Sequence, residues 1–246
     1  MCAILGLSCK DKELTNYIVK ELLLQSQIRG KHATGISFYD NGENIGVISK
    51  PIPSSKFIED IDLPSGYVIG HCRYSTSDLK YNQPLLGYNI SLVHNGVITQ
   101  ESPEQWEQDF GCQNLKTRND SELLLRCIEE DGKPFVKFDK SSIACGYLTG
   151  GKMFCFRGNT RPLWLFNGDI DSDCRFTGFA STEDIIFRTM KKLGLHNNVN
   201  VMKTEPFVKY IFMHDDSIKE VSMKVKHPSM FENEQQISTK IENKYV

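Results

Sequence analysis

The sequence predicts an α+β domain in which antiparallel sheets are stacked and helices cover their outer faces. Three observations predict this class. Stretches of alternating apolar and polar residues dominate the chain, and the few helical patterns do not alternate regularly with them. The dipeptide Gly150-Gly151 also joins two such stretches, which is typical of a hairpin between neighbouring antiparallel strands.

Ten stretches with period-two patterning predict the strands of these sheets. Along the chain they cover residues 33–39, 45–50, 67–74, 90–93, 143–149, 152–157, 175–180, 199–202, 207–213 and 218–224. Because most of them are separated by short polar segments, we expect antiparallel neighbours and not a parallel sheet with helical crossovers.

Three helices are predicted from spacing and from capping residues. Leu14, Ile18 and Leu22 place apolar side chains on one face, which predicts an amphipathic helix over residues 12–28. The other two begin at capping-box pairs, and the last ends at a glycine suited to a left-handed C-terminal position. These signals are Asn119 with Glu122, Ser181 with Asp184, and Gly194.

Length, composition and charge are those of a globular domain. The chain has 246 residues, of which 39% are hydrophobic and 24% charged, so it can bury a core. Lys and Arg number 29 and Asp and Glu 31, and the net charge of −2 disfavours binding of nucleic acid through many phosphates. No linker interrupts residues 1–225. We expect one domain over residues 2–225 and a mobile polar tail over residues 226–246.

The cysteines and the amino-terminal segment indicate the compartment. Eight cysteines are scattered without a C-x-x-C pair, which argues against a zinc ribbon and favours reduced, buried thiols. The start of the chain lacks the pattern of a signal peptide, and apolar runs such as Leu22–Leu24 are too short to span a membrane. We expect a cytoplasmic protein that uses no membrane, no cofactor and no metal.

Cys2 is the cysteine that needs an explanation, because it becomes the first residue when Met1 is removed. It would then hold a thiol and an α-amine on one residue. Such an amine titrates at about pH 7.7 to 8.0 in peptides, so near neutral pH it can accept the thiol proton. An amino-terminal cysteine can therefore act as a nucleophile without a histidine, although a single cysteine at this position is more often structural.

Several short motifs occur in the same chain as Cys2 and in a recognisable order. They are Cys-Ala-Ile-Leu-Gly at 2–6, Arg-Gly-Lys-His-Ala-Thr-Gly at 29–35, His-Cys-Arg-Tyr-Ser-Thr at 71–76, His-Asn-Gly-Val-Ile at 94–98 and Arg-Asn-Asp-Ser-Glu at 118–122, followed by matching segments at 157–163 and 179–183. Over residues 2–195 this order resembles the glutaminase domain of class II glutamine amidotransferases. The resemblance implies the N-terminal-nucleophile hydrolase fold, a four-layer αββα sandwich with two antiparallel sheets.

The resemblance also implies a catalytic centre. Cys2 would attack the side-chain amide of L-glutamine and pass through a thioester, and Asn95 with the backbone N–H of Gly96 would form the oxyanion hole. Arg29 aligns with an arginine near the nucleophile. Read without the family, Asn95-Gly96 predicts a type I′ turn, and Arg29 is a cation well placed at the end of a helix.

The two ends of glutamine that do not react call for a cation and a carboxylate. By the resemblance, Arg73 and the Thr76 hydroxyl would bind the α-carboxylate, and Asp120 would bind the α-ammonium group. Taken singly, Arg73 would be a surface charge and Asp120 a helix N-terminal acid. The polar segment 75–87 fits a lid over the substrate. The departures from the family pattern are Asp78, in place of glycine, and Gln100, in place of asparagine.

Three histidines also occur in these motifs. His32, His71 and His94 lie at strand ends without a helical i, i+4 partner, and we expect structural roles for them.

No phosphate-binding, sugar-isomerase-like or phosphoribosyl-binding motif is visible, so we expect a separate synthase that consumes the ammonia. Two alternatives remain open: a free-standing N-terminal-nucleophile amidase, and a catalytically silent regulatory or interaction subunit.

Overall fold

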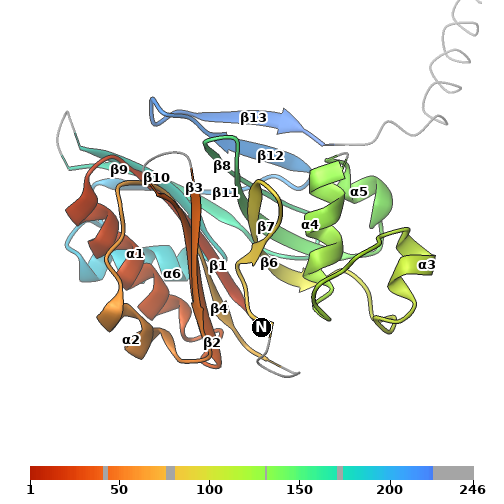
Figure 1. Cartoon of the computed structure of the whole chain (residues 1–246). Coiled ribbons are helices and arrows are strands. Elements are labelled where there is room, and N and C mark those ends of the chain that lie inside the picture. Colours follow the sequence, from red (N-terminus) through yellow and green to blue (C-terminus); the bar gives the residue numbers. More distant parts are fainter. Residues whose placement is uncertain (41–43, 76–80, 131, 171–173, 224–246) are drawn as a thin grey trace, which may run out of the picture.

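Two antiparallel sheets lie face to face, and helices cover the outer side of each (Figure 1). The computed structural model describes residues 1–40, 44–75, 81–130, 132–170 and 174–223. This arrangement confirms the predicted α+β sandwich of antiparallel sheets. The predicted tail over 226–246 and the domain boundary at 225 lie outside the described residues.

The first sheet has seven strands in the order β11-β9-β10-β1-β4-β2-β3. Its strands are β1 (Ala3–Cys9), β2 (Ala33–Asp40), β3 (Asn44–Lys50), β4 (Gly66–Arg73), β9 (Trp164–Asp169), β10 (Arg175–Ala180) and β11 (Val199–Lys203). The strand that follows Cys2, β1, is the middle one, paired with β10 on one side and with β4 on the other. From Leu5 onward β1 is therefore held by two ladders, and its first residues, Ala3 and Ile4, pair with β4.

The second sheet has six strands in the order β13-β12-β8-β7-β6-β5. They are β5 (Leu85–Leu86), β6 (Ile90–Val97), β7 (Ser142–Thr149), β8 (Lys152–Arg157), β12 (Val208–Phe212) and β13 (Ile218–Ser222). Gly150 and Gly151 both have positive φ in the β7–β8 connection, which confirms the predicted hairpin.

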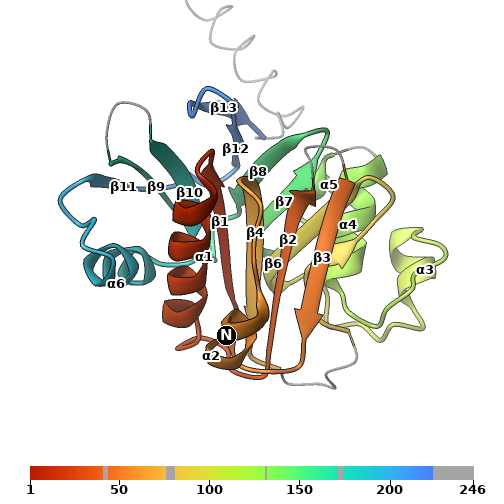
Figure 2. The ribbon, with the colours of Figure 1, turned by 60° about the vertical axis from the view of Figure 1, so that its left-hand side comes forward.

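Helices form the two outer layers of the sandwich. On the first sheet lie α1 (Lys12–Ser26) and α6 (Glu183–Lys192), in contact with each other (Figure 2), with α2 (Ser54–Phe57) and the 3₁₀ turn η1 (Ile58–Asp60) nearby. On the second sheet lie α4 (Ser121–Glu130) and α5 (Pro134–Lys137), and α3 (Trp106–Phe110) lies at the edge. In the described part of the chain, no helix is long and apolar enough to cross a lipid bilayer.

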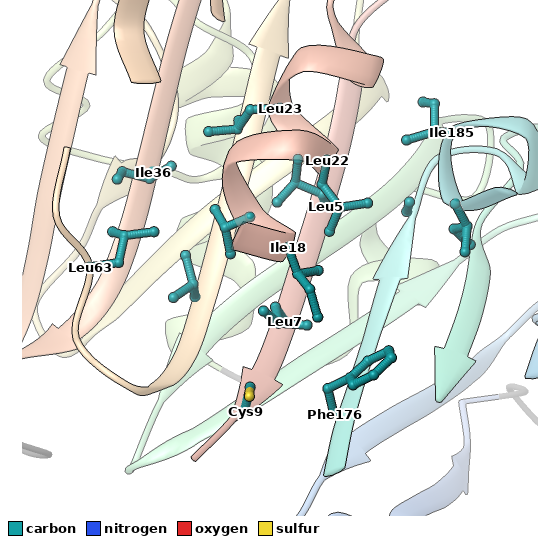
Figure 3. Packing of buried hydrophobic residues seen from close by; sticks show 14 of the residues in the cluster. Leu5, Leu7, Cys9, Ile18, Leu22, Leu23, Ile36, Leu63, Phe176 and Ile185 are labelled. Carbon is teal, nitrogen blue, oxygen red and sulfur yellow. The ribbon is translucent and has the colours of Figure 1, made fainter. Parts of the chain in front are cut away.

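Each interface between layers has its own buried core. Leu5, Leu7 and Cys9 of β1 face α1 and α6 (Figure 3), whereas Ile4 faces the second sheet. This alternation is the two-residue period of a strand. Between the sheets, the ring of Phe179 fits where Gly6 and Gly146 carry no side chain, because a Cβ on either glycine would collide with it. The two sheets thus pack closely in the middle.

Two strands of the first sheet were not predicted. β1 is buried on both faces throughout its length, so it shows no apolar–polar alternation. β9 ends in the polar segment Asn167-Gly168-Asp169, which is more typical of a turn. The three predicted helices are confirmed as α1, α4 and α6, and Gly194 has the expected positive φ after α6.

The two predicted capping boxes form only in part: Asn119 Oδ1 accepts a hydrogen bond from the Ser121 N–H at 3.1 Å, but the reciprocal bonds do not form in the described residues. The Glu122 carboxylate accepts hydrogen bonds from the backbone N–H groups of Lys116 and Thr117, at 2.8 and 2.6 Å, and so ties down the preceding loop. Ser181 accepts a hydrogen bond from the N–H of Ile4 at 2.9 Å. Glu122 thus binds the loop just before its helix, and Ser181 makes a tertiary contact with β1, in place of the expected caps.

Candidate active site

A cavity of about 430 Å³ opens at the end of the sandwich where β1 begins and β6 ends. Cys2, Arg73, Gly96 and Asp120 are among the residues that line it. These four come from the start of β1, the end of β4, the end of β6 and the start of α4. The structure therefore brings together around one cavity residues that the sequence analysis had singled out from distant segments.

Cys2 lies directly before β1, on the side of the first sheet that faces the second. Ile4 packs between the sheets, and strand alternation puts the side chain two residues earlier on the same side. The Cys2 Sγ lies 3.8 Å from the carbonyl oxygen of Tyr74, and Arg29 Nε donates to the Cys2 carbonyl oxygen at 3.0 Å. With Ser181 bound to the Ile4 N–H, the backbone that follows the thiol is fixed by side chains from two other segments.

Asn95 and Gly96 lie inside β6, where they pair with Ala144 and Ile143 of β7. The turn predicted from these two residues is therefore wrong. Asn95 shares its strand face with Val93, which packs between the sheets, and its side chain is 2% exposed. Its Nδ2 has no hydrogen-bond partner among the described residues. A buried amide N–H without a partner is costly. Asn95 is not itself among the residues that line the cavity, whereas its neighbours His94 and Gly96 are.

Gly96 occupies a position where no side chain fits. A Cβ would collide with the carbonyl oxygen of Ser142 and lie 2.6 Å from Nε2 of His94. Because glycine leaves this space empty, the backbone of β6 reaches the wall of the cavity. The glycine is thus required by close packing at this site and not by a turn.

Asp120 is fixed at the start of α4 by the backbone that continues β6. Its Oδ2 accepts hydrogen bonds from the N–H groups of Ile98 at 2.6 Å and Thr99 at 3.4 Å. Glu122, which is almost fully buried, holds the loop before it. The carboxylate of Asp120 therefore has a defined position on the cavity wall before any ligand binds.

Arg73 ends β4 on the opposite side of the cavity and is 9% exposed. Its Nη1 donates to the carbonyl oxygen of Tyr81 at 2.8 Å and to Oδ1 of Asn82 at 2.6 Å. The guanidinium thus contacts the segment that we expected to act as a lid. Thr76, the predicted second ligand of the α-carboxylate, lies outside the described residues, and so does Asp78.

A network that the sequence did not reveal joins β6 to α4. The Ser121 Oγ lies 2.8 Å from Nδ1 of His94 and accepts a hydrogen bond from Nε2 of Gln83 at 3.1 Å. The Oε1 of Gln83 accepts from the backbone N–H of His94 at 2.6 Å. Burial lowers the pKa of His94, although the nearby Asp120 carboxylate and the contact with the Ser142 carbonyl oxygen act in the opposite direction. No local motif connects these three residues, because they meet only in the folded chain.

His71 is buried in β4 next to this network, with neither ring nitrogen bonded to a described residue. Burial, the charge of Arg73 and the proximity of His94 lower its pKa to about 3. Its ring is therefore uncharged at neutral pH. Within the described ranges, no group of three or more His, Cys, Asp or Glu side chains is placed to hold a metal ion.

Two arginines approach the amino terminus. Arg29 Nη2 lies 3.8 Å and Arg161 Nη1 lies 3.5 Å from the Sδ of Met1. Burial lowers the pKa of Arg29, and the nearby charge of Arg161 lowers it further. Arg29 was predicted to lie near the nucleophile, whereas no role was predicted for Arg161.

Comparison with known proteins gives a partial sequence match. No family model matches the chain. A stretch of 111 residues, 42% of the chain, is 33% identical to an amidophosphoribosyltransferase of Pyrococcus horikoshii, and it covers 23% of that enzyme.

Solved structures share the fold over most of the chain. A glutamine phosphoribosylpyrophosphate amidotransferase from B. subtilis, complexed with ADP and GMP, matches 92% of this chain with a TM-score of 0.70 and 20% identity. An allosteric regulatory enzyme of purine biosynthesis matches the same share with a TM-score of 0.68 and 20% identity. The chain spans about half the length of these two proteins, 50% in each case.

A third structure is a glutamine aminotransferase class-II domain protein from Silicibacter pomeroyi. It matches 91% of this chain over 100% of its own length, with a TM-score of 0.58 and 11% identity. These neighbours and the two stacked antiparallel sheets confirm what the motifs implied: the chain has the N-terminal-nucleophile hydrolase fold and resembles the glutaminase domain of class II glutamine amidotransferases.

Proposed function

We propose that this chain is the glutaminase component of a glutamine amidotransferase, with Cys2 as the nucleophile after removal of Met1. One observation carries the proposal: Cys2, Gly96, Arg73 and Asp120 line the same cavity. A nucleophile, an oxyanion site and two charged groups of opposite sign are the set that an amino-acid amide requires.

The proposed reaction begins when the α-amine of Cys2 accepts the thiol proton, directly or through one water. The sulfur attacks the side-chain amide carbon of glutamine, and the oxygen of the tetrahedral intermediate accepts hydrogen bonds from Asn95 Nδ2 and the Gly96 N–H. The amine then returns its proton to the leaving nitrogen, and the C–N bond breaks to give ammonia and a thioester. Water cleaves the thioester, and glutamate and the free thiol are regenerated.

The charged groups would hold the end of glutamine that does not react. We assign the α-ammonium group to Asp120, whose Oδ2 is already held by the Ile98 N–H. We assign the α-carboxylate to Arg73, with Thr76 as a second donor. Each charged hydrogen bond of this kind contributes about 1.5 to 3 kcal/mol, so the pair would select an α-amino acid over a simple amide.

The ammonia would pass to a synthase that is a separate subunit or domain. The matched amidotransferases are about twice as long as this chain, which covers 50% of each. We propose L-glutamine as the substrate, a synthase as the partner and the cytoplasm as the location. Cofactor and metal play no part in the proposed steps.

The test uses the alanine variant of Cys2 and a cysteine control. Cys2→Ala should abolish glutamine hydrolysis while leaving the melting temperature unchanged, and Cys174→Ala should retain full activity, since Cys174 lies outside the cavity. The electrophile diazo-oxo-norleucine should label Cys2 alone, as located by peptide mass spectrometry. Intact mass should show that Met1 is absent from the active protein.

Three outcomes would overturn the proposal. Labelling chiefly at another cysteine, or hydrolysis by Cys2→Ala, would remove Cys2 from its role. Retained Met1 together with absent hydrolysis would favour the silent subunit. Full turnover by the isolated chain, with no synthase that depends on it, would favour the free-standing amidase.

A further inference from the structure

Two guanidinium groups converge on the residue attached to the Cys2 amine. Arg29 and Arg161 approach the same Met1 sulfur from different segments, at 3.8 and 3.5 Å. Arg29 belongs to the turn after α1, and Arg161 to the loop between β8 and β9. Within the described part of the chain, neither forms an ion pair with a carboxylate. Both side chains are half-buried, and both donate to neutral oxygens, Arg29 to the Cys2 carbonyl and Arg161 to the Ser142 hydroxyl.

The other charged and titratable groups around the amino terminus do not compensate these cations. From β4 come Arg73, a third cation, and His71, which is uncharged. From β6 comes His94, whose pKa is lowered by burial. Asp120, from the start of α4, is the carboxylate on the cavity wall, and two backbone N–H groups already share one of its oxygens. Arg118, from the loop before α4, is a further cation on the cavity wall and pairs with Glu104 at 2.6 Å. His32 accepts a hydrogen bond from the Ser75 N–H at the edge of the cavity.

The hydroxyl group of Ser142 links Arg161 to β6, the strand that carries Asn95 and Gly96. Ser142 Oγ accepts a hydrogen bond from Arg161 Nε at 3.2 Å and another from the Val97 N–H at 3.0 Å. Val97 directly follows Gly96 at the end of β6. The guanidinium therefore has a fixed position relative to both the amino terminus and the proposed oxyanion hole.

We propose that Arg161 is a positioning residue that, together with Arg29, keeps the α-amine of Cys2 uncharged at neutral pH and so ready to accept the thiol proton. This inference rests on the proposed function. A nearby positive charge disfavours the protonated amine and favours the thiolate.

The test compares Arg161→Gln, Arg161→Lys and Arg161 intact, with Arg188→Gln as a control on α6, where Arg188 pairs with Asp184 at 2.9 Å. Each protein is prepared with Met1 removed by a methionine aminopeptidase and checked by intact mass. Two quantities are measured against pH: kcat/KM for glutamine, and the rate at which iodoacetamide alkylates Cys2 in the absence of glutamine. The melting temperature reports the fold.

For Arg161→Gln we expect the acid limb, the pH range over which kcat/KM and the alkylation rate fall on acidification, to shift to higher pH by about 0.5 to 1 unit. A shift of this size is that expected for the loss of one nearby positive charge at an effective dielectric constant of about 20 to 40. Arg161→Lys keeps the charge and should restore the limb to within about 0.2 pH units. Ser142→Ala removes the acceptor that positions the guanidinium and should give a smaller shift in the same direction. Arg188→Gln should match the unaltered protein.

An unmoved acid limb in Arg161→Gln, by both measurements, would overturn the inference. So would equal loss of activity in the glutamine and lysine variants without a shift in pH dependence, since that pattern indicates a structural role. If no protein hydrolyses glutamine, yet alkylation of Cys2 shifts as expected, the proposed function fails and the effect of Arg161 on Cys2 stands. If Arg161→Gln does not fold, Ser142→Ala decides the question.

Discussion

Replacement of Asn95 by alanine should raise stability and destroy activity, two effects of opposite sign from one side chain. The Asn95 side chain is 2% exposed, and its Nδ2 has no hydrogen-bond partner among the described residues. Leaving such a donor unpaired costs the resting fold about 1 to 3 kcal/mol. Removal of the amide group loses roughly 1 kcal/mol of packing. Asn95→Ala should therefore raise the free energy of unfolding by about 0 to 2 kcal/mol.

The effect on catalysis follows from the same atom. If Nδ2 donates to the oxyanion, its partner exists only in the tetrahedral intermediate, so the hydrogen bond lowers the barrier and leaves substrate affinity unchanged. Loss of one such donor costs about 10²- to 10³-fold in kcat, or roughly 2.7 to 4 kcal/mol. KM for glutamine should change by less than about threefold.

The assay pairs urea unfolding with glutamate release, and the matched control is Asn167→Ala. Asn167 also lies within a strand, β9, but it is exposed and far along the sheet from the cavity. The control should alter neither quantity. If Asn95→Ala instead lost more than about 2 kcal/mol of stability while keeping kcat within threefold, Asn95 would be a structural residue, and the assignment of the oxyanion hole would be wrong.

Three more predictions follow from the site. Asp120→Asn keeps an oxygen that can accept from the Ile98 N–H but removes the negative charge. The value of kcat/KM for glutamine should therefore fall about 10- to 150-fold, with little change in melting temperature. Unaltered kinetics would reject the contact between Asp120 and the α-ammonium group. Gly96→Ala should lower the free energy of unfolding by about 1 to 3 kcal/mol and abolish hydrolysis, because the new methyl group meets the Ser142 carbonyl; a stable, active variant would contradict this packing. The pKa of His71 is about 3 in the folded chain and about 6.5 in the unfolded chain. Between these two values the unfolded chain binds a proton that the folded chain does not bind. The free energy of unfolding should therefore fall on acidification, by up to about 1.4 kcal/mol per pH unit down to about pH 3. Urea unfolding at pH 7 and pH 4.5 should show a shallower acid dependence for His71→Phe than for the unaltered protein, and equal slopes would argue against a buried neutral ring.

The sequence predicted well what depends on local periodicity and on the order of motifs. Alternation located β2, β4, β7 and β8, and the motif order indicated the layers and which segments lie near Cys2. Alternation failed for β1, whose seven residues are all buried and mostly apolar. β4 and β7 are also buried on both faces, so burial alone does not separate the strands that alternation located from the one it missed.

Local rules failed where tertiary contacts replaced local ones. Asn95-Gly96 has the composition of a tight turn, but pairing with β7 keeps it extended. Glu122 reaches back to the loop before α4 and not to a helix cap. Arg161 and Gln83 belong to the site through side-chain hydrogen bonds to residues 11 to 38 positions away, and a lone arginine or glutamine carries no signal of such a contact.

The position of Met1 determines where other polypeptide can be attached to this protein. Met1 is 65% exposed, and the residue after it lines the cavity, so a tag or carrier domain fused at this end would pass across the cavity mouth and convert the Cys2 amine into an amide. The last described strand, β13, is at the edge of the second sheet, and Figure 1 shows it at the other end of the molecule from the amino terminus. Expression, immobilisation and fusion to a partner should therefore use the carboxyl-terminal side, and an amino-terminal fusion is a simple way to prepare a folded but inactive protein.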